Sequence, residues 1–243
     1  MTYRHEIVVR LIMQLKTLIQ VSFKILVLFL IGYTISHFLR EAINAVCNSV
    51  GVPNEVRIIV SRFSVIAYIL PFIFLGPQRL FTSEVLRIGN FRASISFPLI
   101  WRGKEDPIWR FLVIFAFVMA VGSCFFIYSF TNDLNSSSLR LLLYYGLIFS
   151  LVNSILEEWV WRGVLLNQYV KWFGNVYGLI VTSLLFGISH YNLGFSVWVC
   201  IAFSVGGFFM GGSAIRSKGI VASILMHIYM NLIFVWTGMI FNS

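Results

Sequence analysis

Charged residues are scarce in this chain. Only 11% of its 243 residues are charged, whereas a soluble domain usually carries about a quarter. Among the charged residues, the nine acidic ones are outnumbered by 18 basic ones. Hydrophobic residues make up 59% of the chain. This composition excludes an ordinary soluble domain and indicates an integral membrane protein.

Cysteines are also few. Cys47, Cys124 and Cys200 lie far apart and include no CxxC pair, so we expect neither a disulfide framework nor a cysteine metal site. The net charge is +9, but in so apolar a chain the basic residues are better explained by their placement beside a membrane than by nucleic acid. We therefore expect the lipid bilayer, and no nucleic acid, as a partner.

The chain contains several long apolar runs. Several reach the roughly 20 residues that a helix needs to cross a bilayer core of about 30 Å, and none shows the strict alternation of a transmembrane strand. We predict an all-α, polytopic transmembrane helix bundle of seven to eight spans, with seven of them at 18–39, 57–76, 110–130, 139–157, 175–190, 194–213 and 219–240.

The longest connection, residues 77–109, separates two parts of the chain. Its stretch RLFTSEVLRI repeats apolar residues at helical spacing, so we expect it to lie in the membrane interface, with a re-entrant piece around FPLIW as the alternative. We divide the chain into N-terminal transmembrane helices with this connection, residues 1–109, and a C-terminal transmembrane core, residues 110–243.

Basic residues are distributed unevenly among the connections. With seven spans, four basic regions fall on one side of the membrane, whereas TNDLNSSS and YNLGF on the other side have no basic residue. The positive-inside rule then predicts a multi-pass protein of the cell membrane with a cytoplasmic N-terminus. The basic residues concerned include Arg4, Arg10, Lys16, Arg79, Arg87, Arg92, Arg102, Lys104, Arg162, Lys171, Arg216 and Lys218.

Four ionisable residues lie within or at the ends of the C-terminal apolar runs. They are Glu157 and Glu158 in SILEEWVWRGVLL, His190 in FGISH and His227 in HIYMN. Such groups are costly inside a membrane, so each is a candidate functional residue.

Spacing along the predicted helices separates these residues by role. Glu158 and Arg162 are four residues apart and can form an ion pair on one helical face, whereas Glu157 points elsewhere and lacks that partner. His227 and Asn231 share a face by the same rule, as do Phe186 and His190.

The segments EEWVWRG, FGISH and HIYMN resemble, in this order, the three motifs of the CPBP family of intramembrane proteases, also called the Abi or CAAX-protease family. The resemblance covers about residues 145–235, and Trp161 stands where the family more often has Phe. It implies that Glu157 and His190 activate a water molecule for attack on a peptide bond. It also implies that His227 and Asn231 stabilise the oxyanion, while Glu158, Arg162 and Phe186 support the site.

Other hydrolytic mechanisms fit the sequence less well. Two histidines and a glutamate could hold zinc, but HExxH is absent, and we expect no metal and no other cofactor. The only aspartates, Asp106 and Asp133, lie in connections rather than as a membrane pair. Ser189 precedes His190 directly, and neighbours on a helix point about 100° apart, which is poor geometry for a serine protease.

The expected activity is that of an endopeptidase acting on a membrane-associated or lipidated peptide or protein. Prenylated CaaX proteins and secreted peptides such as bacteriocins both remain open as substrates. The alternatives are a bacteriocin-immunity or membrane interaction protein, in which polar contacts only hold helices together, and a proton-relaying transporter. Polar contacts between helices would explain Glu158, Arg162 and Asn231, but they would not explain why Glu157 has no partner.

Overall fold

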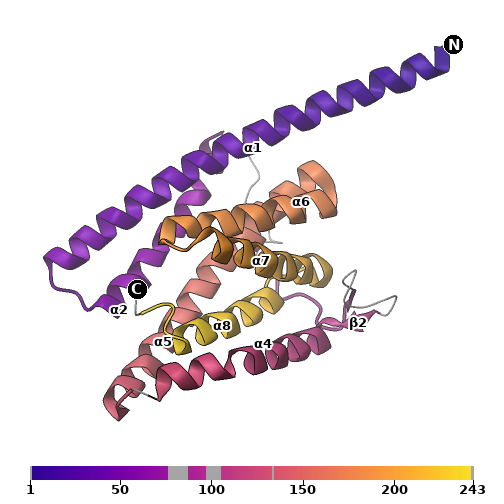
Figure 1. Cartoon of the computed structure of the whole chain (residues 1–243). Helices are drawn as coiled ribbons and strands as arrows, with labels where there is room; N and C mark the ends of the chain where they lie inside the picture. Colours follow the sequence, from indigo (N-terminus) through magenta and orange to yellow (C-terminus); the bar gives the residue numbers. More distant parts are fainter. Residues whose placement is uncertain (1, 76–86, 97–104, 133, 242–243) are drawn as a thin grey trace.

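The computed structural model describes residues 2–75, 87–96, 105–132 and 134–241. Nearly all of these residues lie in helices (Figure 1), and the predicted all-α membrane helical bundle is confirmed. Five described segments are long and apolar enough to cross a bilayer, and Val221–Trp236 is a shorter apolar helix. The number of spans, seven to eight, stays a prediction.

Helix α1 runs from Thr2 to Ser49. No proline and only one glycine interrupt this stretch, and the helix ends just before Gly51, which adopts a positive φ of 69°. At 1.5 Å per residue, its 48 residues measure about 72 Å. The helix is therefore much longer than the predicted span 18–39, and its N-terminal part extends beyond the other helices in Figure 1.

A second helical rod lies beside α1 and consists of α2 (Asn54–Ser61), η1 (Arg62–Tyr68) and α3 (Leu70–Leu75). The two rods approach closely because Gly32 of α1 has no side chain: a Cβ there would lie 3.0 Å from the Cα atom of Tyr68. Segment η1 also contacts α5 and η2, so the second rod lies between α1 and the helix that carries the two glutamates.

The connection after α3 is described only in part. The FPLIW piece, 97–101, and all of the predicted interfacial helix except Arg87 and Ile88 lie outside the described residues. The described part contains a short antiparallel ribbon of β1 (Ser94–Ile95) and β2 (Asp106–Pro107). Helix α4 (Ile108–Thr131) follows directly and packs against the last helix of the chain.

Helix α5 spans Ser136–Glu158. Asn135 caps its N-terminus, because the Asn135 side chain accepts a hydrogen bond from the backbone N–H of Ser138. It continues without a break into the π-helical segment η2 (Trp159–Leu166). The predicted span 139–157 is therefore too short. Glu157 and Glu158 lie in the interior of a longer helix rather than at its end, next to a π-helical turn of the kind that often marks a functional site.

Helix α6 (Asn167–Ser189) reverses direction at Gly174, which has φ 78° and ψ 172°. A Cβ on Gly178 would lie 2.7 Å from the backbone nitrogen of Val170, although eight residues of a straight helix would separate the two by about 12 Å. The apolar segment Ser136–Leu193 consequently forms two helical arms. Only glycine adopts such a backbone angle without strain.

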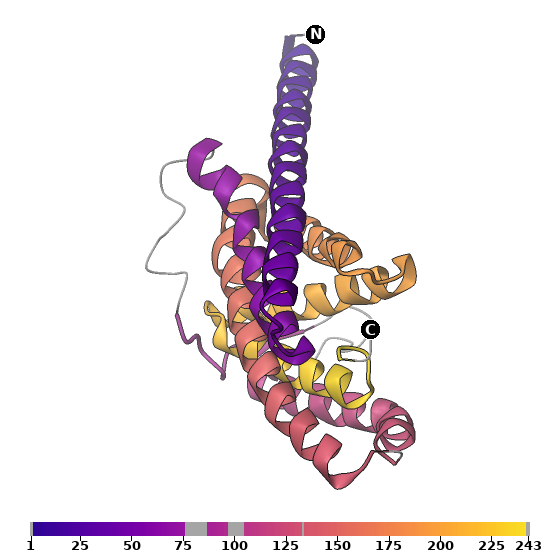
Figure 2. The same cartoon turned by 90° about the vertical axis from the view of Figure 1, so that its left-hand side faces the viewer.

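The chain ends with η3 (His190–Leu193), α7 (Val197–Ser217) and α8 (Val221–Trp236). Helix α6 packs along α7, while α8 contacts α4, α5 and α7. Figure 2 shows α8 lying next to α5. The end of α6 and the middle of α8 are thus brought to the helix that carries the two glutamates.

Arg162 is placed differently from the prediction. We predicted that Arg162 lies in a connection, among the basic residues on the cytoplasmic side. Instead it lies in η2 and is only 4% exposed. Its charge is paired with Glu158 inside the protein. The prediction of a cytoplasmic N-terminus therefore depends on the remaining basic residues.

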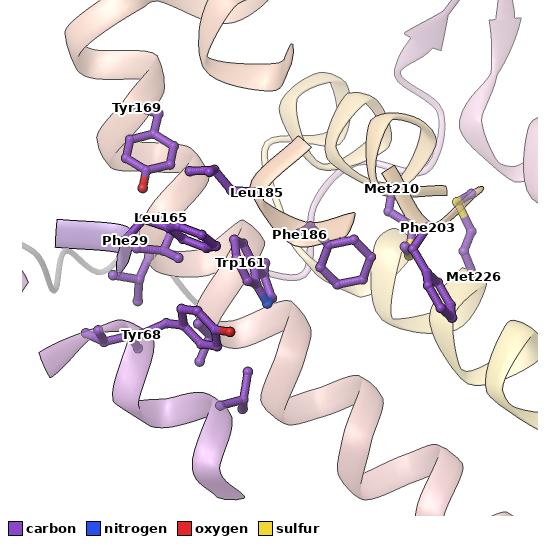
Figure 3. Close-up of a cluster of buried hydrophobic side chains, with 14 of the residues drawn as sticks. Phe29, Tyr68, Trp161, Leu165, Tyr169, Leu185, Phe186, Phe203, Met210 and Met226 are labelled. Atoms are coloured by element: carbon purple, nitrogen blue, oxygen red, sulfur yellow. The ribbon is translucent and has the colours of Figure 1, made fainter. Parts of the chain in front are cut away.

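Aromatic side chains fill the space between the N-terminal rods and the motif helices (Figure 3). The Trp161 ring lies 5.3 Å from the ring of Tyr68 and 5.5 Å from that of Phe186, measured between centroids. Trp161 is 1% exposed, so the tryptophan that stands in place of the family's phenylalanine packs as an apolar core residue.

Candidate active site

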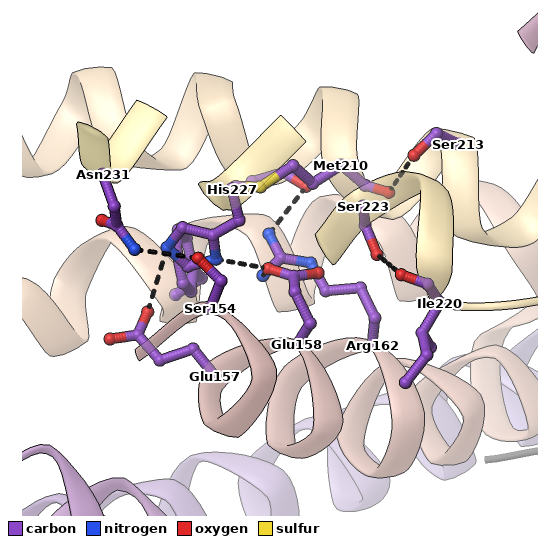
Figure 4. Close-up of polar contacts among 12 residues, drawn as sticks. Ser154, Glu157, Glu158, Arg162, Met210, Ser213, Ile220, Ser223, His227 and Asn231 are labelled. Atoms are coloured by element: carbon purple, nitrogen blue, oxygen red, sulfur yellow. Dashed lines mark hydrogen bonds and ion pairs between the residues drawn. The ribbon is translucent and has the colours of Figure 1, made fainter. Parts of the chain in front are cut away.

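The polar residues predicted for the site converge in the interior, although they come from four different elements. Figure 4 shows those of α5, η2 and α8. None of these residues is exposed by more than 6%, a burial that polar groups tolerate only with partners. The residues and exposed fractions are Glu157 5%, Glu158 0%, Arg162 4%, His190 6%, His227 5% and Asn231 4%.

Glu158 has two partners. Arg162 Nη1 donates to its Oε1 atom at 2.7 Å, and His227 Nδ1 lies 2.7 Å from the same oxygen. The ion pair expected from the four-residue spacing is present. The contact with His227 joins α5 to α8 across 69 residues of sequence and has no counterpart in the sequence prediction.

Arg162 and Phe186 pack together. The guanidinium carbon lies 4.3 Å from the centroid of the Phe186 ring, and Nη2 donates to the carbonyl oxygen of Gly207 at 3.3 Å. The edge of the same ring meets His190, with 4.7 Å between ring centroids. Phe186 therefore separates the ion pair from His190 and fixes the position of both.

Glu157 lies between two histidines. Its Oε2 atom is 3.7 Å from His227 Nε2 and 4.0 Å from His190 Nε2. This buried oxygen accepts no hydrogen bond from any group in the described part of the protein. Both acids have a buried Oε2 atom without a hydrogen-bond partner among the described residues, but Glu158 is paired through Oε1 with Arg162 and His227, whereas none of the described groups donates a hydrogen bond to Glu157.

His190 is held in one orientation. Its Nδ1 atom lies 2.8 Å from the carbonyl oxygen of Phe186, and its ring stacks on Phe203 with 4.0 Å between centroids. Because a carbonyl can only accept, Nδ1 carries the proton, and in a neutral imidazole Nε2 then has a free lone pair. That lone pair faces Glu157.

Asn231 lies one turn after His227 on α8, and its amide nitrogen donates to Ser154 Oγ at 3.0 Å. An amide nitrogen carries two N–H groups, so one remains for another acceptor. Ser154 is fully buried and lies four residues before Glu158. It therefore positions Asn231 beside the glutamates.

Two small cavities adjoin the unpartnered carboxylate. One, of about 30 Å³, is bordered by Glu157, His190, Tyr68, Arg40 and Arg62, and the other, of about 20 Å³, also reaches His227 and Asn231. One water molecule needs about 10 to 15 Å³ of such space. Each cavity is thus large enough for a water molecule within reach of Glu157.

Several residues at or beside the site were not predicted from the sequence. Ser154, Arg40, Arg62 and Tyr68 all lie at the site. Arg62 offered a usable signal, since a charged residue inside the predicted span 57–76 is as unusual as the acids and histidines that were singled out.

The donor set does not fit a zinc ion as it stands. With Zn–N bonds of about 2.0–2.1 Å, two ligands of a tetrahedral site lie about 3.3 Å apart, less than the 3.7 and 4.0 Å between Glu157 Oε2 and the two histidines. Among the residues that the structure describes, no group of three or more His, Cys, Asp or Glu side chains is arranged to hold a metal ion.

The fold and the site define a multi-pass membrane protein with a buried Glu–His–Asn constellation. A family model described as "Type II CAAX prenyl endopeptidase Rce1-like" matches residues 139–233, the region that contains all three motifs. The resemblance to the CPBP family is confirmed over this region, and the match supports a protease. No curated protein and no solved structure matches the chain.

Proposed function

We propose that this protein is an intramembrane endopeptidase in which Glu157 and His190 activate a water molecule. The observation that carries the proposal is the Oε2 atom of Glu157, which is buried, lacks a hydrogen-bond partner among the described residues and lies beside two histidine nitrogens and two small cavities. A buried acid without a partner is destabilising, so a functional role accounts for it better than a structural one.

Proton transfer in the proposed reaction begins at Glu157. Its carboxylate takes one proton from the water as the water oxygen attacks the peptide carbonyl carbon, and His190 Nε2 accepts a hydrogen bond from the other water proton. When the C–N bond breaks, protonated Glu157 returns its proton to the leaving nitrogen. A positioned base and acid of this kind typically contributes about 10²- to 10⁴-fold to the rate.

The oxyanion of the tetrahedral intermediate needs donors, and α8 offers two. Asn231 has an N–H group that Ser154 does not use. His227 donates through Nδ1 to Glu158, so it can offer Nε2–H only as an imidazolium ion. We propose that His227 donates from both ring nitrogens when the oxyanion forms. Removing one oxyanion donor typically costs about 10² to 10³ in rate.

The substrate we propose is a peptide held at the membrane, because the candidate residues lie inside apolar helices. The matching family model is described as a prenyl endopeptidase of the CAAX type. A prenylated peptide ending in a CAAX sequence is therefore the first substrate to test, and an unprenylated secreted peptide of the bacteriocin kind is the second.

A membrane interaction or immunity protein is the second candidate function. The network of Glu158, Arg162 and His227 ties α5 and η2 to α8 and would serve such a protein equally well. This alternative gives Glu157 no task, so the two functions differ in what they predict for that residue.

The test is a cleavage assay on the protein purified in detergent, with prenylated and unprenylated peptides. Glu157→Gln should abolish detectable cleavage, while Glu55→Gln, the same change outside both cavities, should leave it unchanged. A chelator should have no effect, since the proposed mechanism uses no metal. Full activity of Glu157→Gln would refute the proposed base, and loss of activity to the chelator with recovery in zinc would refute the metal-free mechanism.

A further inference from the structure

Arg62 is a charged residue inside an apolar segment, and the proposed mechanism does not use it. It is the first residue of η1, within the candidate span Asn54–Phe74. Its guanidinium carbon lies 5.1 Å from the centroid of the Phe149 ring. The buried Nε atom has no hydrogen-bond partner in the described part of the chain, and no acid there lies within ion-pair distance of it.

Arg62 borders both cavities that adjoin Glu157. Arg40, from the neighbouring helix α1, borders the larger one, and its buried Nε atom also lacks a partner among the described residues. One of its terminal nitrogens is already engaged with Glu41 at 2.9 Å. The two rods that carry these arginines lie side by side (Figures 1 and 2), and both arginines border the same cavity.

Arg62 is the charge at the larger cavity that has no ion-pair partner among the described residues. Arg40 also lines this cavity but is paired with Glu41 outside it, and Glu157 is the one carboxylate among the described lining residues. Guanidinium groups match the planar shape of a carboxylate and bind it through paired N–H donors. An uncompensated positive charge in an apolar interior is costly, and a negative group brought by a ligand would offset that cost.

We propose that Arg62, assisted by Arg40, forms a subsite for a carboxylate carried by the substrate. This inference rests on the proposed peptidase function, and it assigns the two arginines to substrate selection rather than to bond cleavage. The carboxylate has two chemical sources, the terminus of the peptide or an acidic side chain near the cleaved bond. Either source would place that part of the peptide on the α1 side of Glu157.

The test measures binding instead of cleavage, so it remains informative if no peptide is cut. Three fluorescent peptides of one sequence are titrated against the full-length protein in detergent: one with a free C-terminal carboxylate, one amidated, and one amidated with a glutamate next to the last residue. The unsubstituted protein should bind at least one acidic peptide about tenfold more tightly than the neutral one, and the preferred peptide identifies the source. Equal affinity for all three would overturn the proposal.

Variants then assign the preference to Arg62. Arg62→Gln should remove the tenfold discrimination and leave binding of the neutral peptide within about twofold, while Arg62→Lys should keep part of it. Arg57→Gln is the matched control, because Arg57 lies on the same rod, bonds to Asn54 and borders neither cavity. If Arg62→Gln weakened binding of all three peptides equally, the arginine would be a support for Glu157 and the subsite would be refuted.

A loss of folding would be recognised separately. Each variant is first checked for a single elution peak and an unchanged melting temperature in detergent, and Arg40→Gln serves as a second variant if Arg62→Gln does not fold. Arg40→Gln should reduce the discrimination about threefold, because one of its nitrogens is already paired with Glu41. Unchanged discrimination in a folded Arg40→Gln protein would remove Arg40 from the subsite.

Discussion

The Nδ1 atom of His227 lies 2.7 Å from Oε1 of Glu158, which fastens the last helix to the helix that carries both glutamates. The same oxygen accepts the hydrogen bond from Arg162. Glu158 therefore joins an arginine one turn away to a histidine 69 residues away, and its contribution should be visible in the stability of the protein.

Glu158→Gln should destabilise the fold strongly. The substitution leaves Arg162 buried without a carboxylate, a change that typically costs about 3–5 kcal/mol. We expect a clear fall in melting temperature in detergent, with loss of activity. The double variant Glu158→Gln, Arg162→Met removes both charges and should recover part of the lost stability. A double variant that melts lower than Glu158→Gln would contradict this account.

Glu157→Gln should behave in the opposite way. Glu157 Oε2 has no hydrogen-bond partner among the described residues, so replacing the charged group with a neutral one of equal size removes a desolvation cost. The melting temperature should stay the same or rise, while cleavage falls by about 10³-fold or more, within the range of a lost general base. A large loss of stability would mean that Glu157 holds the fold together.

Ser154→Ala should impair catalysis without preventing substrate binding. Ser154 Oγ accepts the hydrogen bond that orients Asn231, so its loss would leave a proposed oxyanion donor free to rotate. We expect kcat to fall about tenfold, less than for removing a donor outright, with KM unchanged. Ser154→Thr should restore the activity. Ser150→Ala is the matched control, because that hydroxyl donates only to the carbonyl of Gly146, and it should have no effect.

Sequence spacing predicted the contacts that lie within one helix. Glu158 and Arg162 meet because residues four apart share a helical face. The three motifs lie together, with His190 and His227 both beside Glu157. Apolar run length likewise located the helices of the C-terminal region, since a membrane span needs about 20 apolar residues.

Contacts between distant helices could not be read in the same way. The bond between His227 and Glu158 depends on how α8 packs against α5, and one-dimensional periodicity carries no information on that packing. Arg62 lies outside the three motifs, so helical spacing within them assigned it no role. The continuation of α5 into η2 was missed because Glu157, Glu158 and Arg162 looked like the charged end of a span, whereas burial and mutual pairing let two of these charges stay inside.

Reporter fusions after residues 105, 135 and 217 should give cytoplasmic, external and cytoplasmic signals respectively. The expectation follows from the excess of basic residues on the side of the N-terminus, and it holds for seven spans with 77–109 in the interface. The buried position of Arg162 removes one of the basic residues that supported it, so the result depends on those that remain. An inverted signal at residue 135 alone would show that a span has been miscounted.

Gly187→Ala should disrupt the packing of α6 on α7. A Cβ at Gly187 would lie 1.9 Å from Ser204 Oγ and 2.3 Å from the carbonyl oxygen of Cys200, and the backbone atom cannot move aside without shifting the helix. Small residues allow such close contact between membrane helices, and overpacking typically costs about 1–3 kcal/mol. We expect a lower melting temperature and reduced activity, because His190 follows Gly187 by less than one turn. Gly122→Ala on α4, where a Cβ would meet nothing within 4 Å, should leave both unchanged. Equal melting temperatures for the two variants would show that α6 and α7 do not pack this closely.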